Sequence, residues 1–285
     1  MIAAETSNLT RELRNTAVAD VEVNGHRWHV IDEGDGPVVL FIHGFPLDHS
    51  MWDAQRRFFR DRYRVIIPDL RGFGRSGSAT APLTIPGLAD ELALLLDAVG
   101  AADPVTVCGL SMGGCVALAF VKQDAARMSG LVLCDMRSVG ESPEGQANRR
   151  KMAERVLTEG STIAAEAMMP RLFGPKTNEE HPEILDQIRN TILATSGRSI
   201  AAGQHALADR PDCTPWLGTI TVPTLVMVGE HDVISPPAEM QATANAIPDS
   251  SFVMIARAGH MAPMENAAAV NPALESFLAR TAVRQ

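Results

Sequence analysis

The chain has 285 residues, of which 46% are hydrophobic and 21% are charged, which is typical of a globular protein with one large core. Its formal charge of −9, with no Lys/Arg cluster, argues against nucleic acids and anionic membrane surfaces as partners, because their phosphates need a basic patch. No apolar run approaches the roughly 20 residues of a membrane span, and the first residues lack a secretory-signal pattern. We therefore expect a cytoplasmic protein that acts on a small molecule.

Short apolar runs alternate with helical patterns along most of the chain. The first, residues 21–34, predicts an antiparallel hairpin at the edge of a sheet. The later runs lack polar alternation, so both faces of these strands should be buried, as in a parallel sheet covered by helices. The expected strands are 36–44, 64–70, 104–110, 129–135, 222–230 and 250–259, and the helical patterns between them cover 50–61, 84–101 and 113–128.

The strand pattern is interrupted after Asp135. Residues 136–215 contain helical patterns separated by Gly and Pro and no convincing strand, and the strand pattern resumes near residue 222. We expect an α/β fold in which residues 20–135 and 216–285 form the core domain. Residues 136–215 are expected to form an inserted helical cap.

The sequence Gly-Leu-Ser-Met-Gly at residues 109–113 lies between an expected strand and an expected helix. A G-x-S-x-G turn in this context holds its serine above the sheet, and side chains larger than glycine would collide at its two ends. The turn also places the backbone N–H of Met112 at a helix start, where an unpaired donor can stabilise an oxyanion. Ser111 is therefore the candidate nucleophile. The alternative is a glycine-rich turn whose serine only caps the helix.

A serine nucleophile needs a histidine base and a carboxylate that orients the base, and both follow Ser111 in the chain. Asp232 comes just beyond one expected strand and His260 just beyond the next. Because open α/β sheets build their sites at the carboxyl ends of the strands, the three residues should converge on one edge. Asp232 is the expected acid and His260 the expected base.

Other residues compete for these roles. Asp135 also follows a strand and is the main rival for the acid, and Glu230 and His231 adjoin the favoured aspartate. His43 is expected to be a buried histidine that shapes its loop, because one base is enough. The same loop should supply the second oxyanion donor, and the backbone N–H of Phe45 is the expected group.

Five motifs in chain order resemble the α/β-hydrolase superfamily: HGFPLDHSMW, DLRGFGRS, GLSMGG, GEHD and GHMAPMENA. The chain is similar to the capped, cofactor-free branch that holds serine carboxylesterases, 3-oxoadipate enol-lactonase-like enzymes, C–C bond hydrolases and esterase/perhydrolases. The resemblance spans roughly residues 20–282 and implies a mostly parallel eight-stranded sheet flanked by helices. It also implies nucleophile, acid and base roles for Ser111, Asp232 and His260, and oxyanion roles for Phe45 and Met112.

These observations predict a serine hydrolase that cleaves carboxylic esters of small to medium uncharged acyl groups through an acyl-enzyme intermediate. The alternatives are an enol-lactonase or a C–C bond hydrolase of aromatic degradation, or a non-hydrolytic receptor or lyase of the same fold. The expected partner is a small-molecule ester or lactone, and the sequence leaves a homo-oligomer open. No cofactor and no metal are expected, and the four cysteines lack metal-ligand spacing.

Residues 165–174, AEAMMPRLFG, should place the apolar side chains of a proline-broken helix over the site. Arg171 within them is expected to point to solvent, although an enol-lactonase would need a cation for the carboxylate of its substrate. The run Arg149–Lys151 is expected to be a solvated helix face. The expected pocket residues, besides Phe45 and Met112, are Leu47, Phe73, Met168, Met169, Leu172, Phe173, Val233 and Met261.

Overall fold

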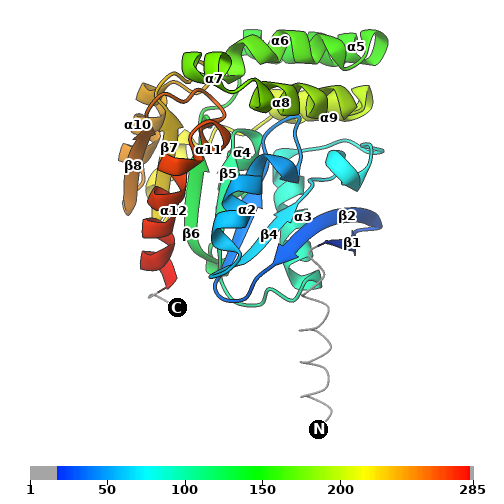
Figure 1. The fold of residues 1–285 in the computed structure, drawn as a ribbon. Coiled ribbons are helices and arrows are strands. Elements are labelled where there is room, and N and C mark those ends of the chain that lie inside the picture. The colour runs from blue at the N-terminus through cyan, green and yellow to red at the C-terminus, as the bar shows by residue number, and fades with distance from the viewer. Residues whose placement is uncertain (1–17, 283–285) are drawn as a thin grey trace.

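The computed structural model describes residues 18–282, which are built around one eight-stranded sheet in the order β1-β2-β4-β3-β5-β6-β7-β8 (Figure 1). β1 pairs antiparallel with β2 and β2 antiparallel with β4, whereas all other pairings are parallel. The mostly parallel α/β sheet predicted from the sequence is therefore confirmed. The strands are β1 (Ala19–Val23), β2 (His26–Glu33), β3 (Val38–Ile42), β4 (Arg64–Pro68), β5 (Val105–Leu110), β6 (Met128–Cys134), β7 (Thr224–Gly229) and β8 (Ser250–Ile255).

The strands in the middle of the sheet are buried on both faces. Every residue of β3, β4, β5 and β7 is buried, which is why their sequences show no polar alternation. The strands at the two edges differ, because only one face of each is covered. β1 alternates in exposure, and β8 carries the side chain of Met254, which is 53% exposed.

Helices cover both faces of the sheet (Figure 1). Helices α2 (Asp53–Phe59) and α12 (Ala267–Ala282) contact each other and the strands on one face. The other face is covered by α3 (Ile85–Ala98), α4 (Met112–Asp124) and α10 (Pro237–Ala246). Shorter elements at the ends of strands are η1 (His49–Trp52), η2 (Gly74–Ser76), η3 (Ala125–Arg127), η4 (Thr214–Thr219) and α11 (Ala262–Glu265).

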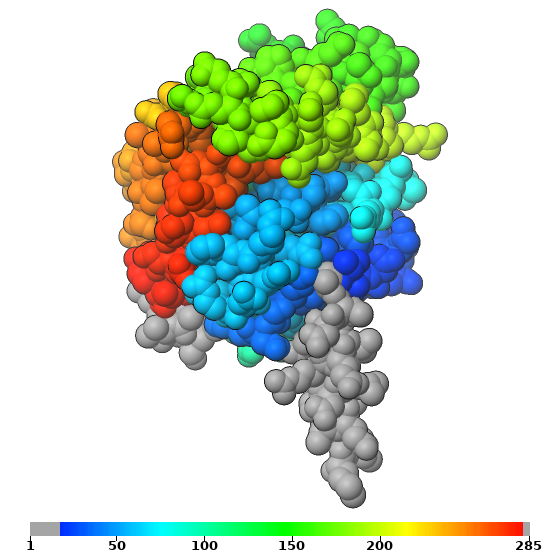
Figure 2. Space-filling model, viewed as in Figure 1, coloured from blue at the N-terminus to red at the C-terminus, as the bar shows by residue number. Residues whose placement is uncertain are grey.

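Five further helices lie between β6 and β7 in the chain and stack over one end of the sheet, where they form a continuous green layer (Figures 1 and 2). We call them the cap helices. α5 packs along α9, and α6 contacts both α5 and α8. The sequence patterns did not predict α7, because its residues PKTNEE lack apolar periodicity. The cap helices are α5 (Pro143–Glu159), α6 (Thr162–Leu172), α7 (Pro175–Glu180), α8 (Pro182–Ala194) and α9 (Gly197–Ala208).

Pro170 lies inside α6, which continues to Leu172. The expectation of a proline-broken helix was therefore wrong. A proline removes one backbone hydrogen bond, and here the loss falls in the last turn of the helix, where it does not end the element. Among residues 18–282, no helix is long and apolar enough to cross a membrane.

Candidate active site

Ser111 lies at the sharp turn between β5 and α4. Its backbone adopts φ 53° and ψ −113°, a strained conformation for a residue with a side chain, and its N–H donates to the carbonyl of Cys134 at 2.9 Å. The two glycines of the turn permit this geometry. A Cβ at Gly109 would lie 2.2 Å from the carbonyl oxygen of Gly113, and a Cβ at Gly113 would lie 2.3 Å from that of Ile42. The two glycines therefore allow the close backbone approaches that this turn at Ser111 requires.

His260 connects Ser111 to Asp232 through two hydrogen bonds. Nε2 of His260 lies 3.0 Å from Oγ of Ser111, and Nδ1 lies 2.9 Å from Oδ2 of Asp232. The other oxygen of Asp232 accepts the N–H groups of Ile234 and Ser235 at 2.7 and 2.9 Å, which fixes the carboxylate. The carboxylate keeps the proton on Nδ1, so Nε2 is free to accept the hydroxyl proton of Ser111.

The rival residues lie outside this line. Asp135 is fully buried; one oxygen accepts the N–H of Gly229 at 2.7 Å and the other has no partner. Burial, and to a smaller degree the charge of Asp232, raises the pKa of Asp135 well above its ordinary value, which favours its neutral form. Glu230 and His231 are both exposed.

The turn that carries His260 is anchored to the cap by Glu265, a residue that the sequence analysis did not single out. Oε1 of Glu265 accepts the N–H groups of the two residues that flank His260, at 2.8 and 3.0 Å. Oε2 accepts the N–H of Gly174 and the hydroxyl of Thr177, both at 2.7 Å. The N–H of His260 itself donates to the carbonyl of Leu172 at 2.9 Å. Burial raises the pKa of Glu265, although these hydrogen bonds oppose the shift.

Phe45 and Met112, the expected oxyanion donors, both line the same cavity as Ser111. Met112 is the first residue of α4, so its N–H has no acceptor within the helix. Phe45 lies two residues after His43, in a loop that His43 shapes. The side chain of His43 is fully buried. Nε2 of His43 accepts the N–H of Leu70 at 2.9 Å, and Nδ1 donates to the carbonyl of Gly44 at 2.9 Å. His43 is thus a buried residue that shapes its loop, as the sequence predicts.

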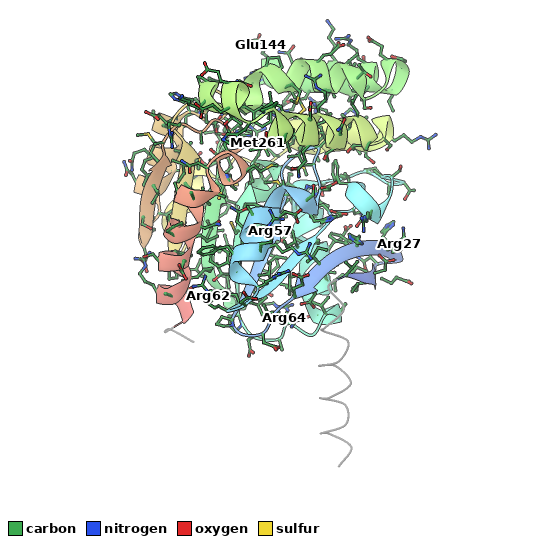
Figure 3. The ribbon with its side chains drawn as sticks, viewed as in Figure 1. Arg27, Arg57, Arg62, Arg64, Glu144 and Met261 are labelled. Atoms are coloured by element: carbon green, nitrogen blue, oxygen red, sulfur yellow. The ribbon has the colours of Figure 1, made fainter. Side chains whose placement is uncertain are left out.

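A cavity of about 390 Å³ lies between the core and the cap helices and includes Ser111 and His260 in its wall. In Figure 3, Met261 is seen at this junction, beneath the cap helices. Several of the expected pocket residues line the cavity. They are Phe45, Leu47, Met112, Met168, Leu172 and Met261.

Phe73 and Val233 were expected in the pocket and do not line it. Phe73 is buried beneath the cavity wall, where its ring packs edge-on against Phe45 with centroids 6.1 Å apart. Val233 is 61% exposed. The turn after Asp232 points Val233 outward and brings the next two residues, Ile234 and Ser235, into the wall.

Met169 and Phe173 were also expected in the pocket and are buried elsewhere. The residues of α6 that line the cavity follow the spacing of one helical face, and Met169 lies about 100° away from Met168 on the helix. Phe173 is the first residue after α6, where the chain becomes extended and crosses toward the histidine turn. The cavity-lining residues of α6 are Ala164, Ala167, Met168, Arg171 and Leu172.

The cavity contains a charged group that the sequence analysis missed. Glu141 accepts hydrogen bonds from Arg149 at 2.6 Å and from Arg210 at 2.8 Å. Burial alone would raise the pKa of Glu141, but the two guanidinium groups outweigh it and lower the pKa to about 2. The expectation that Arg149 belongs to a solvated face was wrong, because it shares its face of α5 with the cavity-lining Met152. Arg171 is exposed and also lines the cavity.

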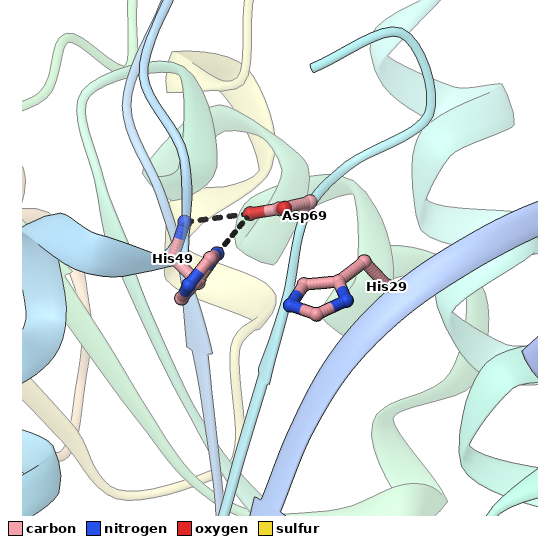
Figure 4. A group of neighbouring side chains, drawn as sticks. All are labelled: His29, His49 and Asp69. Carbon is pink, nitrogen blue, oxygen red and sulfur yellow. Dashed lines mark hydrogen bonds and ion pairs between the residues drawn. The ribbon is translucent and has the colours of Figure 1, made fainter. Parts of the chain in front are cut away.

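Among the described residues, one group of side chains has the composition and spacing to hold a metal ion: His29, His49 and Asp69 (Figure 4). It shares no residue with the line from Ser111 to Asp232.

Comparison with known proteins defines the family. Residues 37–267 match the family model of the alpha/beta hydrolase fold. The chain belongs to this family. A solved structure of a thermophilic esterase from Thermogutta terrifontis with malate bound is 43% identical, with a TM-score of 0.90 over 93% of this chain and 98% of that one.

Enol-lactonases are also similar to this hydrolase. The enol-lactonase structure from Burkholderia xenovorans LB400 is 30% identical, with a TM-score of 0.85 over 92% of this chain and 100% of that one. The 3-oxoadipate enol-lactonase 2 of Acinetobacter baylyi is 29% identical over 92% of this chain and 94% of that protein. The resemblance found in the sequence is therefore confirmed: the chain is an α/β hydrolase of the branch that includes esterases and enol-lactonases.

Proposed function

We propose that this hydrolase cleaves carboxylic esters through an acyl-enzyme intermediate on Ser111. The observation that carries the proposal is the unbroken hydrogen-bonded line from Asp232 through His260 to Ser111, which ends in the cavity. A hydroxyl is a weak nucleophile at neutral pH, and a histidine with a fixed tautomer supplies the base that it needs.

In the proposed reaction, Nε2 of His260 takes the proton of Ser111 as Oγ attacks the ester carbonyl. The N–H groups of Phe45 and Met112 hold the oxyanion, and each lowers the activation free energy by roughly 3 kcal/mol. His260 then protonates the departing alkoxide, and later activates the water that releases the acid. Asp232 stabilises the imidazolium in both steps. The reaction requires no metal and no coenzyme.

The acyl group is proposed to be uncharged and of small to medium length. Most of the cavity wall around Ser111 is apolar, and each methylene buried there contributes up to about 0.8 kcal/mol until the space is full. The volume of about 390 Å³ lies toward the small end of ligand pockets. The apolar wall includes Leu47, Leu110, Met152, Met168, Leu172, Leu207, Ile234 and Met261.

The test is a burst experiment with p-nitrophenyl butyrate, together with a fluorophosphonate label. We expect a burst followed by steady turnover, and a label that maps to Ser111. Release that stops after one equivalent would instead indicate a non-hydrolytic receptor of the same fold. A label on another residue would refute the assignment of the nucleophile.

A second candidate substrate class is esters or lactones that carry a free carboxylate. Four arginines line the described part of the cavity, Arg137, Arg149, Arg171 and Arg210. Glu141 pairs with Arg149 and Arg210, and Glu239 pairs with Arg137, so two carboxylates oppose the four cations. This excess of positive charge favours an anionic substrate. The similarity to enol-lactonases, and to an esterase solved with malate bound, supports the same reading.

The two substrate classes can be separated by kcat/KM for p-nitrophenyl acetate, butyrate, hexanoate and decanoate beside the p-nitrophenyl monoester of succinic acid and a carboxylate-bearing lactone. If the substrate is uncharged, the highest kcat/KM should be found among the alkyl esters. If kcat/KM for the lactone exceeds that for the best alkyl ester by more than about tenfold, and Arg171→Ala removes that advantage, the substrate carries a carboxylate and the proposal of an uncharged acyl group is wrong. Arg149→Gln is the corresponding test of the deeper arginine.

A further inference from the structure

Two histidines and an aspartate come together where β2, the start of η1 and the segment after β4 meet. His29 comes from β2, His49 from the start of η1, and Asp69 from the segment just after β4 (Figure 4). One nitrogen of each ring and one carboxylate oxygen lie within 4.8 Å of one another. His29 and Asp69 are buried, and the side chain of His49 is 14% exposed. The positions are twenty residues apart and match no ligand-spacing motif, and the sequence analysis expected no metal because the cysteines lack metal-ligand spacing.

The decisive observation is the unpartnered nitrogen of His29. Its side chain is only 4% exposed and its Nε2 atom is buried without a hydrogen-bond partner. Nδ1 lies 3.5 Å from Oδ1 of Asp20 on the neighbouring strand, which favours the tautomer with its proton on Nδ1. In Figure 4 a ring nitrogen of His29 faces His49 and Asp69. A buried lone pair without a donor is rare, and an ion is one of its ordinary explanations.

We propose that His29, His49 and Asp69 bind a divalent transition-metal ion such as Zn²⁺. Two imidazoles and one carboxylate form a common protein ligand set for this ion, with a water completing the coordination. Nε2 of His29 is already free. His49, whose Nδ1 lies 2.7 Å from Oδ1 of Asp69, must release its Nδ1 proton to bind.

The surroundings are organised as metal sites usually are. Asp20 faces the far nitrogen of His29, and Asp69 is held by the backbone N–H groups of His49 and Arg75, both at 2.7 Å. The guanidinium of Arg75 is a nearby positive charge that would repel a bound cation, but it is exposed to solvent, which screens it. Zn–N bonds of about 2.0–2.1 Å place tetrahedral ligand atoms roughly 3.3 Å apart, so a pair at the 4.8 Å limit must approach by roughly 1.5 Å on binding. Nδ1 of His49 and Oδ1 of Asp69, now 2.7 Å apart, must separate by roughly 0.6 Å.

Such an ion would join β2 and the segment after β4 to η1, which follows the loop of residues 43–48 that contains Phe45. Leu70, next to Asp69, donates its N–H to His43, and His43 in turn holds the carbonyl of Gly44 just before Phe45. The ion would therefore stabilise the folded state, while the serine chemistry proceeds without it. This proposal is independent of the proposed function, so each can fail separately.

The experiment uses the full chain after treatment with EDTA, titrated with Zn²⁺ in a calorimeter and with Co²⁺ in an absorption spectrometer. We expect one ion per chain, visible Co²⁺ bands of a nitrogen and oxygen site, and a rise in Tm of about 5 °C at saturating Zn²⁺. His29→Gln and His49→Gln should abolish all three signals. The matched control His205→Gln changes an exposed histidine on α9 and should leave them intact.

Ser111→Ala should also bind the ion normally, which separates this site from the active site. The proposal is overturned if no saturable binding occurs, or if binding survives His29→Gln. Equal loss in His205→Gln would likewise overturn it, because the ion would then be held by surface histidines. If His29→Gln does not fold, His49→Gln decides by the same readouts.

Discussion

Glu265 ties the turn of His260 to the cap helices, and Glu265→Ala is the change that tests how much this anchor matters. The substitution removes the acceptor of three backbone N–H groups, two beside His260 and one at Gly174, and of the hydroxyl of Thr177. The hydroxyl can turn to water, but the three amides lie in a mostly buried place. The loss of these hydrogen bonds therefore acts on the turn of His260 and on the cap together.

The magnitude follows from these contacts. At about 1 kcal/mol for each amide left unpaired, the free energy of unfolding should fall by about 3 kcal/mol, less whatever is regained because a buried carboxylate is removed. A domain with roughly 5–15 kcal/mol of stability still folds after this loss. Because a displacement of about 1 Å in a catalytic group can cost 10²-fold, kcat should fall by about 100-fold while KM changes little.

Glu265→Gln provides the intermediate case. Its carbonyl oxygen can serve both amides beside His260 while its amino group donates to the hydroxyl of Thr177. Only the N–H of Gly174 then remains unpaired, so we expect a loss of about 1 kcal/mol in stability and less than about tenfold in kcat. Glu144→Ala, at an exposed glutamate near the start of α5 (Figure 3), is the matched control and should change neither.

The assays are urea unfolding for stability, steady-state hydrolysis of p-nitrophenyl butyrate for kcat and KM, and the rate at which a fluorophosphonate labels Ser111. The labelling rate reports the alignment of His260 with the hydroxyl directly. The reasoning is refuted if Glu265→Ala loses stability while kcat and the labelling rate stay within about threefold of the parent enzyme. It is also refuted if the Gln and Ala variants are equally impaired.

Further expectations concern the catalytic line and the charged group in the cavity. Ser111→Ala should lower kcat by at least about 10³-fold with an unchanged thermal unfolding curve, and activity within about tenfold of the parent would remove Ser111 from the mechanism. Asp232→Asn should cost about 10⁴-fold in kcat, because the imidazole of His260 loses its fixed tautomer. Asp135→Asn should cost less than about tenfold, because Asp135 bonds the N–H of Gly229 and not His260, and the reverse order in steady-state assays would transfer the acid role to Asp135. The pKa of Glu141 is about 2 in the folded protein, against an ordinary 4.5, so its stabilisation is complete above that ordinary pKa and is lost as pH falls toward 2. Between about pH 4.5 and pH 2, the free energy of unfolding in urea should therefore fall less for Glu141→Gln than for the parent protein. Parallel plots of that free energy against pH would contradict the lowered pKa of Glu141. EDTA should leave ester hydrolysis unchanged at a temperature well below Tm while lowering Tm in preparations that carry metal, and a loss of kcat there would place an ion in the chemistry.

Local sequence patterns determined the framework of this protein. The apolar runs of β3 to β7 indicate burial on both faces, which is typical of a parallel sheet covered by helices. The two glycines within two residues of Ser111 permit its strained backbone, and the G-x-S-x-G pattern could be found from the local sequence alone. The order of Ser111, Asp232 and His260 along the chain was informative because parallel strands end at a common edge, so a residue just after each strand is placed without knowledge of the packing.

The lining of the cavity and its supports depended on tertiary structure. Met168 and Met169 have the same chemistry, yet only Met168 faces the cavity, because the rotation of α6 is set by its contacts with α5 and α8. Arg149 looks like a surface cation until α5 packs against α9 and encloses it with Glu141. Contacts such as these join residues that are distant in the chain, and a one-dimensional pattern specifies the direction of a side chain relative to its own helix but not the neighbour that it meets.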